Sequence, residues 1–276
     1  MNKNCPIGIF DSGYGGLTIL KEVVKLLPEY DYIYLGDNAR TPYGTRSFDV
    51  VYSYTRESVL KLFEMGCKLV ILACNTASAK ALRTIQQRDL PLLDPSLRVL
   101  GIIRPSVESF PVLSTNHHIG ILGTKGTVSS GSYLMESEKL YGKTAFQITQ
   151  VACPLLVPLI ESNELQGEGT EFFVKKYIRE LLQADPDIDT IVLACTHYPL
   201  LKDLIRRNVP EQVKVVEQGQ LIASSLQDYL HRHPEMEREI SRGSSVRYFT
   251  TEKADLFADM VEVFMGGAVE AEEIKI

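Results

Sequence analysis

Short apolar runs alternate with longer amphipathic segments along most of the chain, and this alternation predicts the fold class. In the first half the apolar runs have the length of strands, and the segments between them repeat apolar residues at helical spacing. The predicted strands are residues 7–10, 32–35, 68–73 and 99–103, and the predicted helices are residues 17–27, 54–65 and 77–86. Such alternation favours an α/β fold in which a mostly parallel sheet is flanked by helices.

The same order of elements begins again in the second half of the chain. Strands are predicted at residues 119–122, 146–151 and 190–194, and helices at residues 130–141 and 171–182. Two short sequences also return in the same order. Residues 7–10 (IGIF) return as residues 119–122 (IGIL), and residues 70–76 (VILACNT) return as residues 191–197 (IVLACTH). Two matches in one order indicate two similar α/β domains related by pseudo-symmetry.

The repeat suggests where the domains begin and end. We expect the first domain to comprise residues 1–103 together with 213–276, and the second to comprise residues 104–212. The last segment, with a helix from about Leu221, a strand at 246–250 and a helix at 253–263, has no counterpart in the repeat and is expected to return to the first domain. Ligands of open α/β sheets bind at the carboxyl ends of the strands, so the predicted active site is the cleft between the domains.

Composition narrows the classes of function. The formal charge of −6 at pH 7 gives no sign of the basic face that binding to nucleic acid or to acidic membranes needs, so neither partner is expected. No apolar run approaches the length of a membrane span, and the first residues lack the hydrophobic region of a secretory signal, so a cytoplasmic location is expected. The five cysteines form no CxxC or Cys/His pattern, which predicts neither a disulfide framework nor a metal site.

Two cysteines occupy equivalent places in the repeat and are the best candidates for chemistry. Cys74 and Cys195 each follow a predicted strand and precede a predicted helix, where the helix dipole and free N–H groups favour a thiolate. A free thiol is only about 3% ionised at pH 7, so such stabilisation matters. The alternative is that both are small buried packing residues, the role expected for Cys5, Cys67 and Cys153. Two equivalent thiols across a cleft suit a reaction whose two faces are chemically alike, such as racemisation.

Polar residues beside the two thiols extend the candidate site. Asp11 begins a glycine-rich loop, residues 11–16, whose spacing differs from that of a dinucleotide-binding loop and whose carboxylate would repel pyrophosphate. Asp11 therefore fits a contact with an amino group or a part in proton transfer, unless the loop is only a tight turn. Asn75–Thr76 and Thr196–His197 supply amide, hydroxyl and imidazole groups, although such residues also cap helices routinely. Residues 37–44 form a polar loop that either borders the cleft or is an ordinary turn.

At these positions the chain resembles the glutamate racemase family. The motifs that carry the resemblance are residues 11–18 (DSGYGGLT), 37–44 (DNARTPYG), 73–78 (ACNTAS), 122–127 (LGTKGT), 152–161 (ACPLLVPLIE) and 194–200 (ACTHYPL). They follow one another in order from Pro6 to beyond Leu201, and the final segment of the chain carries no such motif.

The resemblance implies a cofactor-independent interconversion of L- and D-glutamate that supplies D-glutamate for peptidoglycan, and hence for cell-wall biogenesis and cell shape. Cys74 and Cys195 are implied to be the acid and the base, the first serving the D-isomer and the second the L-isomer. Asp11, His197 and Glu161 are implied to assist them. The positions that match the family's substrate-binding residues are Asp11, Ser12, Pro42, Tyr43, Gly44, Asn75, Thr76, Thr124, Thr127, Thr196 and His197. Family members commonly form homodimers, so a homodimer is expected.

Other interpretations remain open at this point. An aspartate racemase of the same superfamily also carries two cysteines, but such relatives tend to have glutamate where this chain has His197. A non-catalytic two-domain amino-acid-binding protein gives no reason for paired thiols, and a thiol–disulfide oxidoreductase would need two sulfurs close enough to bond. The chain departs from the family pattern at Arg104-Pro105-Ser106, near the expected domain crossover, where Glu-Pro-Gly is usual.

Overall fold

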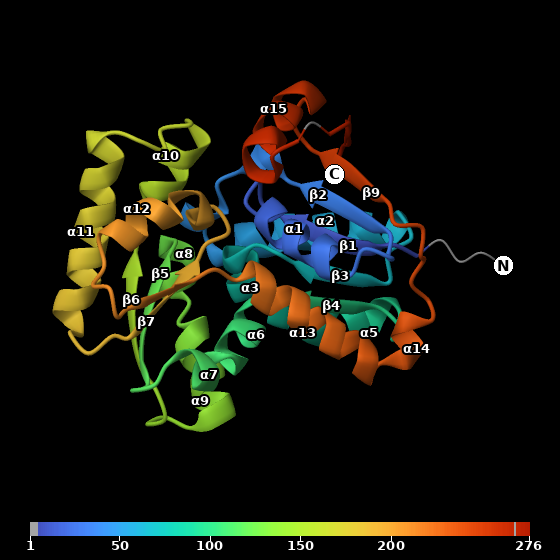
Figure 1. Cartoon of the computed structure of the whole chain (residues 1–276). Helices are drawn as coiled ribbons and strands as arrows, with labels where there is room; N and C mark the ends of the chain where they lie inside the picture. The colour runs from blue at the N-terminus through green and yellow to red at the C-terminus, as the bar shows by residue number, and fades with distance from the viewer. Residues whose placement is uncertain (1–4, 268) are drawn as a thin grey trace.

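The strands form two separate sheets, and every pairing within them is parallel (Figure 1). The computed structural model describes residues 5–267 and 269–276. The first sheet has the order β10-β9-β2-β1-β3-β4, and the second has the order β6-β5-β7-β8. The strands of the first sheet are β1 (Ile7–Asp11), β2 (Tyr32–Gly36), β3 (Leu69–Leu72), β4 (Arg98–Gly101), β9 (Val246–Thr250) and β10 (Ala271–Glu273). Those of the second are β5 (His118–Gly123), β6 (Gln147–Ala152), β7 (Thr190–Ala194) and β8 (Lys214–Val216).

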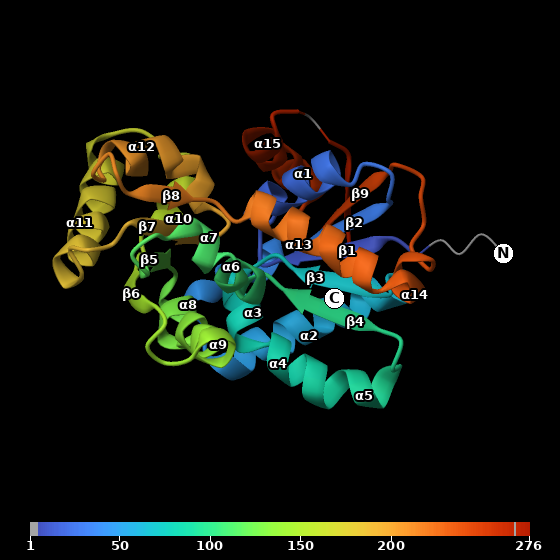
Figure 2. The ribbon, with the colours of Figure 1, turned by 60° about the horizontal axis from the view of Figure 1, so that its bottom comes forward.

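Helices cover both faces of the first sheet, as Figure 2 shows. One face packs against α1 (Leu17–Leu26), α13 (Gly219–Arg232), α14 (Pro234–Glu237) and α15 (Ala254–Met265). The other packs against α2 (Phe48–Glu64), α3 (Asn75–Lys80), α4 (Leu82–Thr84), the π-helical segment η3 (Ile85–Asp89) and α5 (Leu90–Leu93). Two 3-10 helices, η1 (Asn38–Arg40) and η2 (Tyr43–Thr45), follow β2. Because both faces are covered, the inner strands β1, β2 and β3 are buried along their whole length.

The second sheet is also covered on both faces. One face packs against α10 (Leu156–Glu161), α11 (Glu168–Ala184), η4 (Tyr198–Leu201) and α12 (Lys202–Arg207). The other packs against α6 (Ile103–Glu108), α7 (Phe110–Leu113) and α9 (Ser132–Tyr141), while α8 (Lys125–Ser129) follows the carboxyl end of β5. No helix within the described residues is both long and apolar enough to cross a bilayer. The predicted fold class, two similar α/β halves with parallel sheets, is confirmed.

The repeat is visible in both the order and the register of the strands. The order β2-β1-β3-β4 in the first sheet matches the order β6-β5-β7-β8 in the second. Gly8 of β1 pairs with Val70 of β3, and Gly120 of β5 pairs with Ile191 of β7 in the same way. The strands that precede Cys74 and Cys195 therefore occupy equivalent positions in the two sheets.

Some elements differ from the sequence-based prediction. Helix α2 begins at Phe48, earlier than expected, because the Ser47 side chain caps its first turn. The segment predicted as one helix, residues 77–86, is divided among α3, α4 and η3. Strand β9 pairs with β2, so the C-terminal segment returns to the first sheet as expected.

The chain's division between the sheets lies close to the expected domain boundaries. Strand β8, at Lys214–Val216, pairs with β7 in the second sheet and lies beyond the boundary expected at residue 212. Such a short edge strand has too few residues to show a pattern in the sequence. The domain boundaries themselves stay a prediction.

Candidate active site

A cavity lies between the two halves, and Cys74 and Cys195 both line it. Its walls come from segments that follow β1, β2 and β3 of the first sheet and β5, β6 and β7 of the second. The lining residues are Ser12, Thr41, Pro42, Tyr43, Gly44, Thr45, Cys74, Asn75, Thr76, Thr124, Lys125, Cys153, Pro154, Val157, Pro158, Cys195, Thr196 and His197. The carboxyl ends of both sheets thus contribute to one site, as expected for ligands of parallel sheets.

The Cys74 thiol is buried beside hydroxyl, amide and carboxyl groups of the first half. Cys74 is 6% exposed and caps α3, with its Sγ 3.4 Å from the main-chain N–H of Ala77 and 3.4 Å from Ser12 Oγ. Burial and the nearby Asp11 carboxylate raise the pKa of Cys74 to about 12, although the hydrogen bonds from Ser12 and Ala77 oppose the shift. In this environment Cys74 is held in its protonated form at neutral pH.

The Cys195 thiol has a basic neighbour instead. Its Sγ lies 4.0 Å from Nδ1 of His197, and Nε2 of the same imidazole lies 3.0 Å from Oε1 of Glu161. Burial alone would lower the pKa of His197, but its hydrogen bonds to Cys195 and Glu161 and the charges of those groups raise it to about 10. His197 is therefore protonated at neutral pH, and it can donate a hydrogen bond toward the sulfur. The two thiols follow equivalent strands, but only Cys74 caps an α-helix. Cys195 is followed by a turn and then by the 3-10 helix η4, so the expectation that it also lies at the start of an α-helix is wrong, and its charged neighbour His197 takes the place of the helix.

The glycine-rich loop after β1 touches the second half of the site. Asp11 is fully buried and accepts hydrogen bonds from the Gly13 N–H at 2.9 Å and the Thr196 hydroxyl at 3.4 Å. Burial raises the pKa of Asp11, while the charge of His197 opposes the shift. A Cβ atom added to Gly15 would lie 2.4 Å from Nδ1 of His197, so only glycine permits this approach of the two halves.

Three threonines join the halves on the other side of the cavity. The hydroxyl of Thr76 lies 2.9 Å from that of Thr124, and the Thr124 hydroxyl lies 3.1 Å from that of Thr127. Thr124 caps α8 by accepting a hydrogen bond from the Thr127 N–H. Hydroxyl groups can donate and accept in either direction, so this group can turn its protons toward a bound anion.

The loop after β2 is held against the sheet by a buried carboxylate. Asp37 is fully buried and accepts hydrogen bonds from Arg40 Nε at 2.7 Å, from the Thr251 hydroxyl at 2.9 Å and from the Tyr43 hydroxyl. Burial and the charge of Asp37 raise the pKa of Tyr43 well above its usual range. These bonds fix the neighbouring Gly44 in the cavity wall, so the predicted loop at 37–44 does border the site.

Most of the predicted site residues are brought together. The residues that line the cavity are Cys74, Cys195, Ser12, Pro42, Tyr43, Gly44, Asn75, Thr76, Thr124, Thr196 and His197. Asp11, Thr127 and Glu161 lie behind the wall and are hydrogen-bonded to residues that line it. The roles assigned to all of these residues remain predictions.

The cavity also has lining residues that the sequence analysis did not select. Cys153 is buried in the core, as predicted, yet it also lines the cavity together with Pro154 and Val157 from the segment after β6. Its place directly after a strand is the signal that could have identified it. Lys125 adds a positive charge at the start of α8.

One group of side chains outside the cavity has the composition of a metal site. His118, Asp185 and Asp187 have potential ligand atoms within 4.8 Å of one another. His118 begins β5, so the group lies at the opposite end of that strand from the cavity. Nδ1 of His118 is 2.9 Å from Oδ2 of Asp185, and this bond ties the start of β5 to the segment before β7.

Comparison with known proteins agrees with this architecture. Residues 7–226 match the family model described as Asp/Glu/Hydantoin racemase. A curated glutamate racemase of Geobacter metallireducens is 38% identical over 261 residues, which cover 95% of this chain and 93% of the relative.

Solved structures give the same result. A glutamate racemase from Bacillus anthracis superposes with a TM-score of 0.88 at 31% identity, covering 99% of this chain and 98% of the other. The structure of a glutamate racemase from Francisella tularensis, solved in complex with D-glutamate, has a TM-score of 0.85 at 28% identity, with the same coverage of 99% and 98%. The chain therefore belongs to the Asp/Glu/Hydantoin racemase family, among the glutamate racemases.

Proposed function

We propose that this chain interconverts L- and D-glutamate by a two-base mechanism in which Cys74 and Cys195 act on opposite faces of the α-carbon. The observation that carries the proposal is that two thiols, at the ends of equivalent strands in two halves, line one cavity. We propose that a single ligand binds between them, with one sulfur on each side. In one direction Cys74 removes the α-proton as a thiolate and Cys195 donates a proton from its thiol; in the other direction the roles are exchanged.

The charges around the site support a resting state with one sulfur protonated. Cys74, whose pKa is about 12, keeps its proton, and the protonated His197 beside Cys195 stabilises negative charge on the second sulfur. With the protons arranged in this way, Cys195 can remove the α-proton of the enantiomer whose α-proton faces it. For the other enantiomer, Cys74 must lose its proton first.

The bound substrate would itself favour loss of the proton from Cys74. The carboxylate of Asp11 is one cause of the raised pKa of Cys74, after burial. An α-ammonium group bound near Asp11 would neutralise that charge and favour the thiolate. Substrate binding would in this way prepare Cys74 to act as the base.

The remaining difficulty is the carbanionic charge that develops on an amino acid without an electron sink. Fixed hydrogen-bond donors aimed at the α-carboxylate, in a cavity that excludes water, can stabilise that charge. The hydroxyls of Ser12, Thr76, Thr124 and Thr196 line the cavity, and we propose that they supply these donors. We assign the substrate-binding positions to these residues together with Pro42, Tyr43, Gly44 and Thr127. The proposed reaction needs no cofactor, since the two thiols perform both proton transfers.

The biological setting is also proposed. The product D-glutamate would serve peptidoglycan synthesis in the cytoplasm, and the enzyme would act as a homodimer. Support for this setting comes from membership of the family and from the motifs that the chain shares with it.

The test uses purified protein with L-glutamate as the only added reactant. Circular dichroism or chiral chromatography should show D-glutamate appearing until the two isomers are equal, and L-aspartate given separately should remain unchanged. Cys74→Ala and Cys195→Ala should each lower kcat by about 10³-fold or more.

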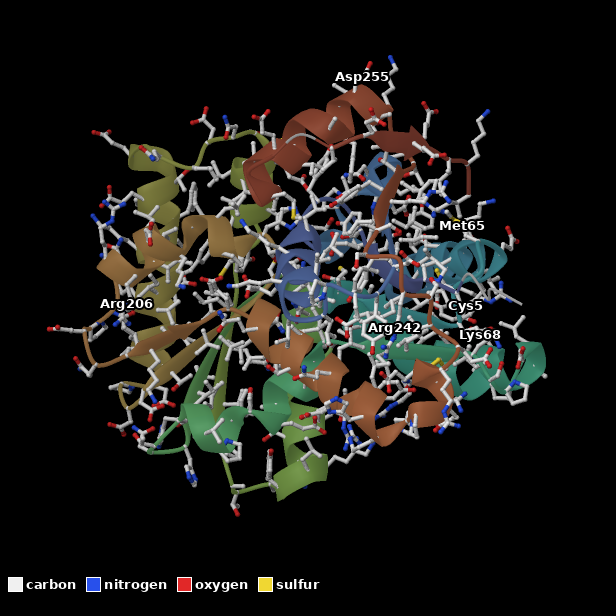
Figure 3. The ribbon with its side chains drawn as sticks, turned by 45° about the vertical axis from the view of Figure 1, so that its right-hand side comes forward. Cys5, Met65, Lys68, Arg206, Arg242 and Asp255 are labelled. Atoms are coloured by element: carbon white, nitrogen blue, oxygen red, sulfur yellow. The ribbon has the colours of Figure 1, made fainter. Side chains whose placement is uncertain are left out.

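A Cys5→Ala variant is the matched control. Cys5 lies with Met65 and Lys68 on the side of the first half that is turned away from the second half (Figure 3), and it precedes the amino end of β1. This variant should keep full activity. Full exchange of the substrate α-proton with deuterated solvent in both of the other cysteine variants would refute the thiol mechanism.

A further inference from the structure

Next to the Cys74 side of the cavity, four buried polar side chains form one hydrogen-bonded cluster. Asn75, Ser106, Tyr133 and Gln218 are each no more than 2% exposed. The Gln218 Oε1 accepts from Asn75 Nδ2 at 2.6 Å, and the Gln218 Nε2 donates to Ser106 Oγ at 2.7 Å and to the Tyr133 hydroxyl at 3.0 Å. We name this set the Gln218 cluster.

Each hydroxyl group of the Gln218 cluster donates one hydrogen bond outside Gln218 and accepts one from it. Ser106 gives its hydroxyl proton to the carbonyl of Ile102 at 2.7 Å, and Tyr133 gives its proton to Asn75 Oδ1 at 2.8 Å. Both hydroxyl oxygens can therefore only accept from Gln218, which must present its NH2 group to them. The Gln218 carbonyl oxygen is then turned toward the Asn75 amide. A satisfied network with fixed proton positions holds its members rigidly.

The cluster joins the places where the chain passes between the two halves. Asn75 follows β3 and Cys74 in the first half, while Tyr133 belongs to α9 in the second. Ser106 lies on α6, on the way from the first sheet to the second, and Gln218 lies between β8 and α13, on the way back. Figures 1 and 2 show α3, α6 and the start of α13 side by side between the halves.

This arrangement changes the interpretation of Asn75. The sequence suggested that its amide binds substrate, and Asn75 does line the cavity. Its Oδ1 and one of its two N–H groups are bonded within the Gln218 cluster, which leaves the second N–H for a ligand. The Asn75 side chain also ties the first turn of α3, which Cys74 caps with its sulfur, to the Gln218 cluster. The position of that sulfur is therefore tied to the crossover segments.

We propose that Gln218 is a positioning residue for the Cys74 half of the reaction. It acts through Asn75 and holds the capping turn of α3, and with it Cys74, at a fixed distance from the α-carbon of the substrate. The proposal rests on the racemisation proposed above. Proton transfer depends steeply on this distance, and a displacement of about 1 Å can lower the rate by about 100-fold.

The experiment compares Gln218→Met with Gln220→Met. The first replaces a buried amide by an apolar side chain of similar length, and the second makes the same change at an exposed position two residues further along. Tyr133→Phe is a second variant that keeps the ring and removes only the hydroxyl. We expect kcat to fall by about 10-fold to 100-fold in Gln218→Met, by about 5-fold in Tyr133→Phe, and not at all in Gln220→Met.

Isotope effects separate a positioning role from a general loss of folded protein. Each enantiomer of glutamate, with hydrogen or deuterium on the α-carbon, is given to each variant and to the unmodified enzyme. If Cys74 is misplaced, its proton transfer becomes slower than that of Cys195. The isotope effect should then rise for the enantiomer that Cys74 deprotonates and fall for the other, for which proton delivery by Cys74 becomes limiting.

Each outcome decides the proposal. Opposite changes of the two isotope effects in Gln218→Met, or in Tyr133→Phe if the first variant does not fold, support it. Unchanged isotope effects, equal changes for both enantiomers, or a kcat equal to that of the unmodified enzyme overturn it while leaving the proposed function intact. An unmodified enzyme that does not racemise glutamate removes the proposed function and this proposal together.

Discussion

The pair formed by Glu161 and His197 offers a sharp test of the electrostatic argument. In the unmodified protein, Nε2 of His197 lies 3.0 Å from Oε1 of Glu161. In Glu161→Gln the side chain keeps its shape and can still accept a hydrogen bond from Nε2, but its negative charge is lost. The imidazolium then has less stabilisation. We expect the pKa of His197 to fall from its value of about 10 in the unmodified enzyme.

Two estimates bracket the size of that fall. The difference between a hydrogen bond to a charged acceptor and one to a neutral acceptor is about 1 to 1.5 kcal/mol. Direct attraction between two charges about 4 Å apart at an effective dielectric constant of about 20 is about 4 kcal/mol. At about 1.4 kcal/mol per pKa unit, the pKa should fall by about one to three units. His197 is 4% exposed, so screening by solvent removes little of the effect.

The assay is a titration of the His197 imidazole followed by NMR, with Glu164→Gln as the control because Glu164 is exposed in the same segment. The control should titrate as the unmodified enzyme does. A pKa in Glu161→Gln within half a unit, a margin well below the expected shift, would show that Glu161 does not hold the proton on His197. In that case the sulfur of Cys195 would have to account for the shift.

The same pair makes a prediction for stability. Because the pKa of His197 is higher in the folded protein than its ordinary value of 6.5, the pair stabilises the fold fully below pH 6.5. This contribution is lost as the pH rises through about 10. Urea denaturation should show the largest difference in free energy of unfolding between Glu161→Gln and the unmodified enzyme near pH 6.5, and no difference above about pH 10.

Three further changes test other parts of the structure. Gly15→Ala would place a Cβ atom 2.4 Å from Nδ1 of His197, so it should separate the halves of the site, lower kcat by about 100-fold and leave the far-ultraviolet circular dichroism unchanged. Tyr34→Phe removes the hydroxyl that donates to the Gly13 carbonyl at 2.9 Å and should reduce the free energy of unfolding by about 1 to 3 kcal/mol, measured with urea. Burial opposes ionisation of Asp189, but hydrogen bonds from the loop before β5 outweigh burial and lower the pKa of Asp189 below its ordinary value of 3.8. The stabilisation of the fold by the ionised Asp189 is therefore present above pH 3.8 and is lost in stronger acid. The unfolding midpoint of Asp189→Asn should therefore lie below that of the unmodified enzyme at neutral pH, and the two should converge as the pH falls below 3.8.

Much of the fold could be predicted because the sequence repeats itself. Residues 70–76 and 191–197 share an apolar strand that ends in cysteine, and the structure gives these strands equivalent places beside β1 and β5. Strands β8 and β10 could not be predicted in the same way. Each has three residues and lies at the edge of a sheet, where β10 (Ala271–Glu273) even carries two glutamates.

The candidate site was predictable in composition but not in the use of each group. The sequence placed Asn75 beside Cys74, yet it could not reveal that Gln218, far along the chain, accepts a hydrogen bond from the Asn75 amide. Likewise, Ser106 attracted notice only as a departure from a motif, and its hydroxyl proves to be a member of a buried cluster. Contacts of this kind depend on how the crossover segments meet, which no local pattern records.

The matching order of strands in the two sheets has a consequence for the kinetics of the proposed reaction. Mirror-image amino acids have equal free energies in water, so kcat/KM must be the same for both, however unlike the groups around the two sulfurs are. The contrast between Asp11 and Ser12 on one side and His197 and Glu161 on the other can therefore appear only in kcat and KM separately. An enzyme built from two copies of one fold can in this way saturate at different concentrations of its two substrates while leaving their final ratio at unity.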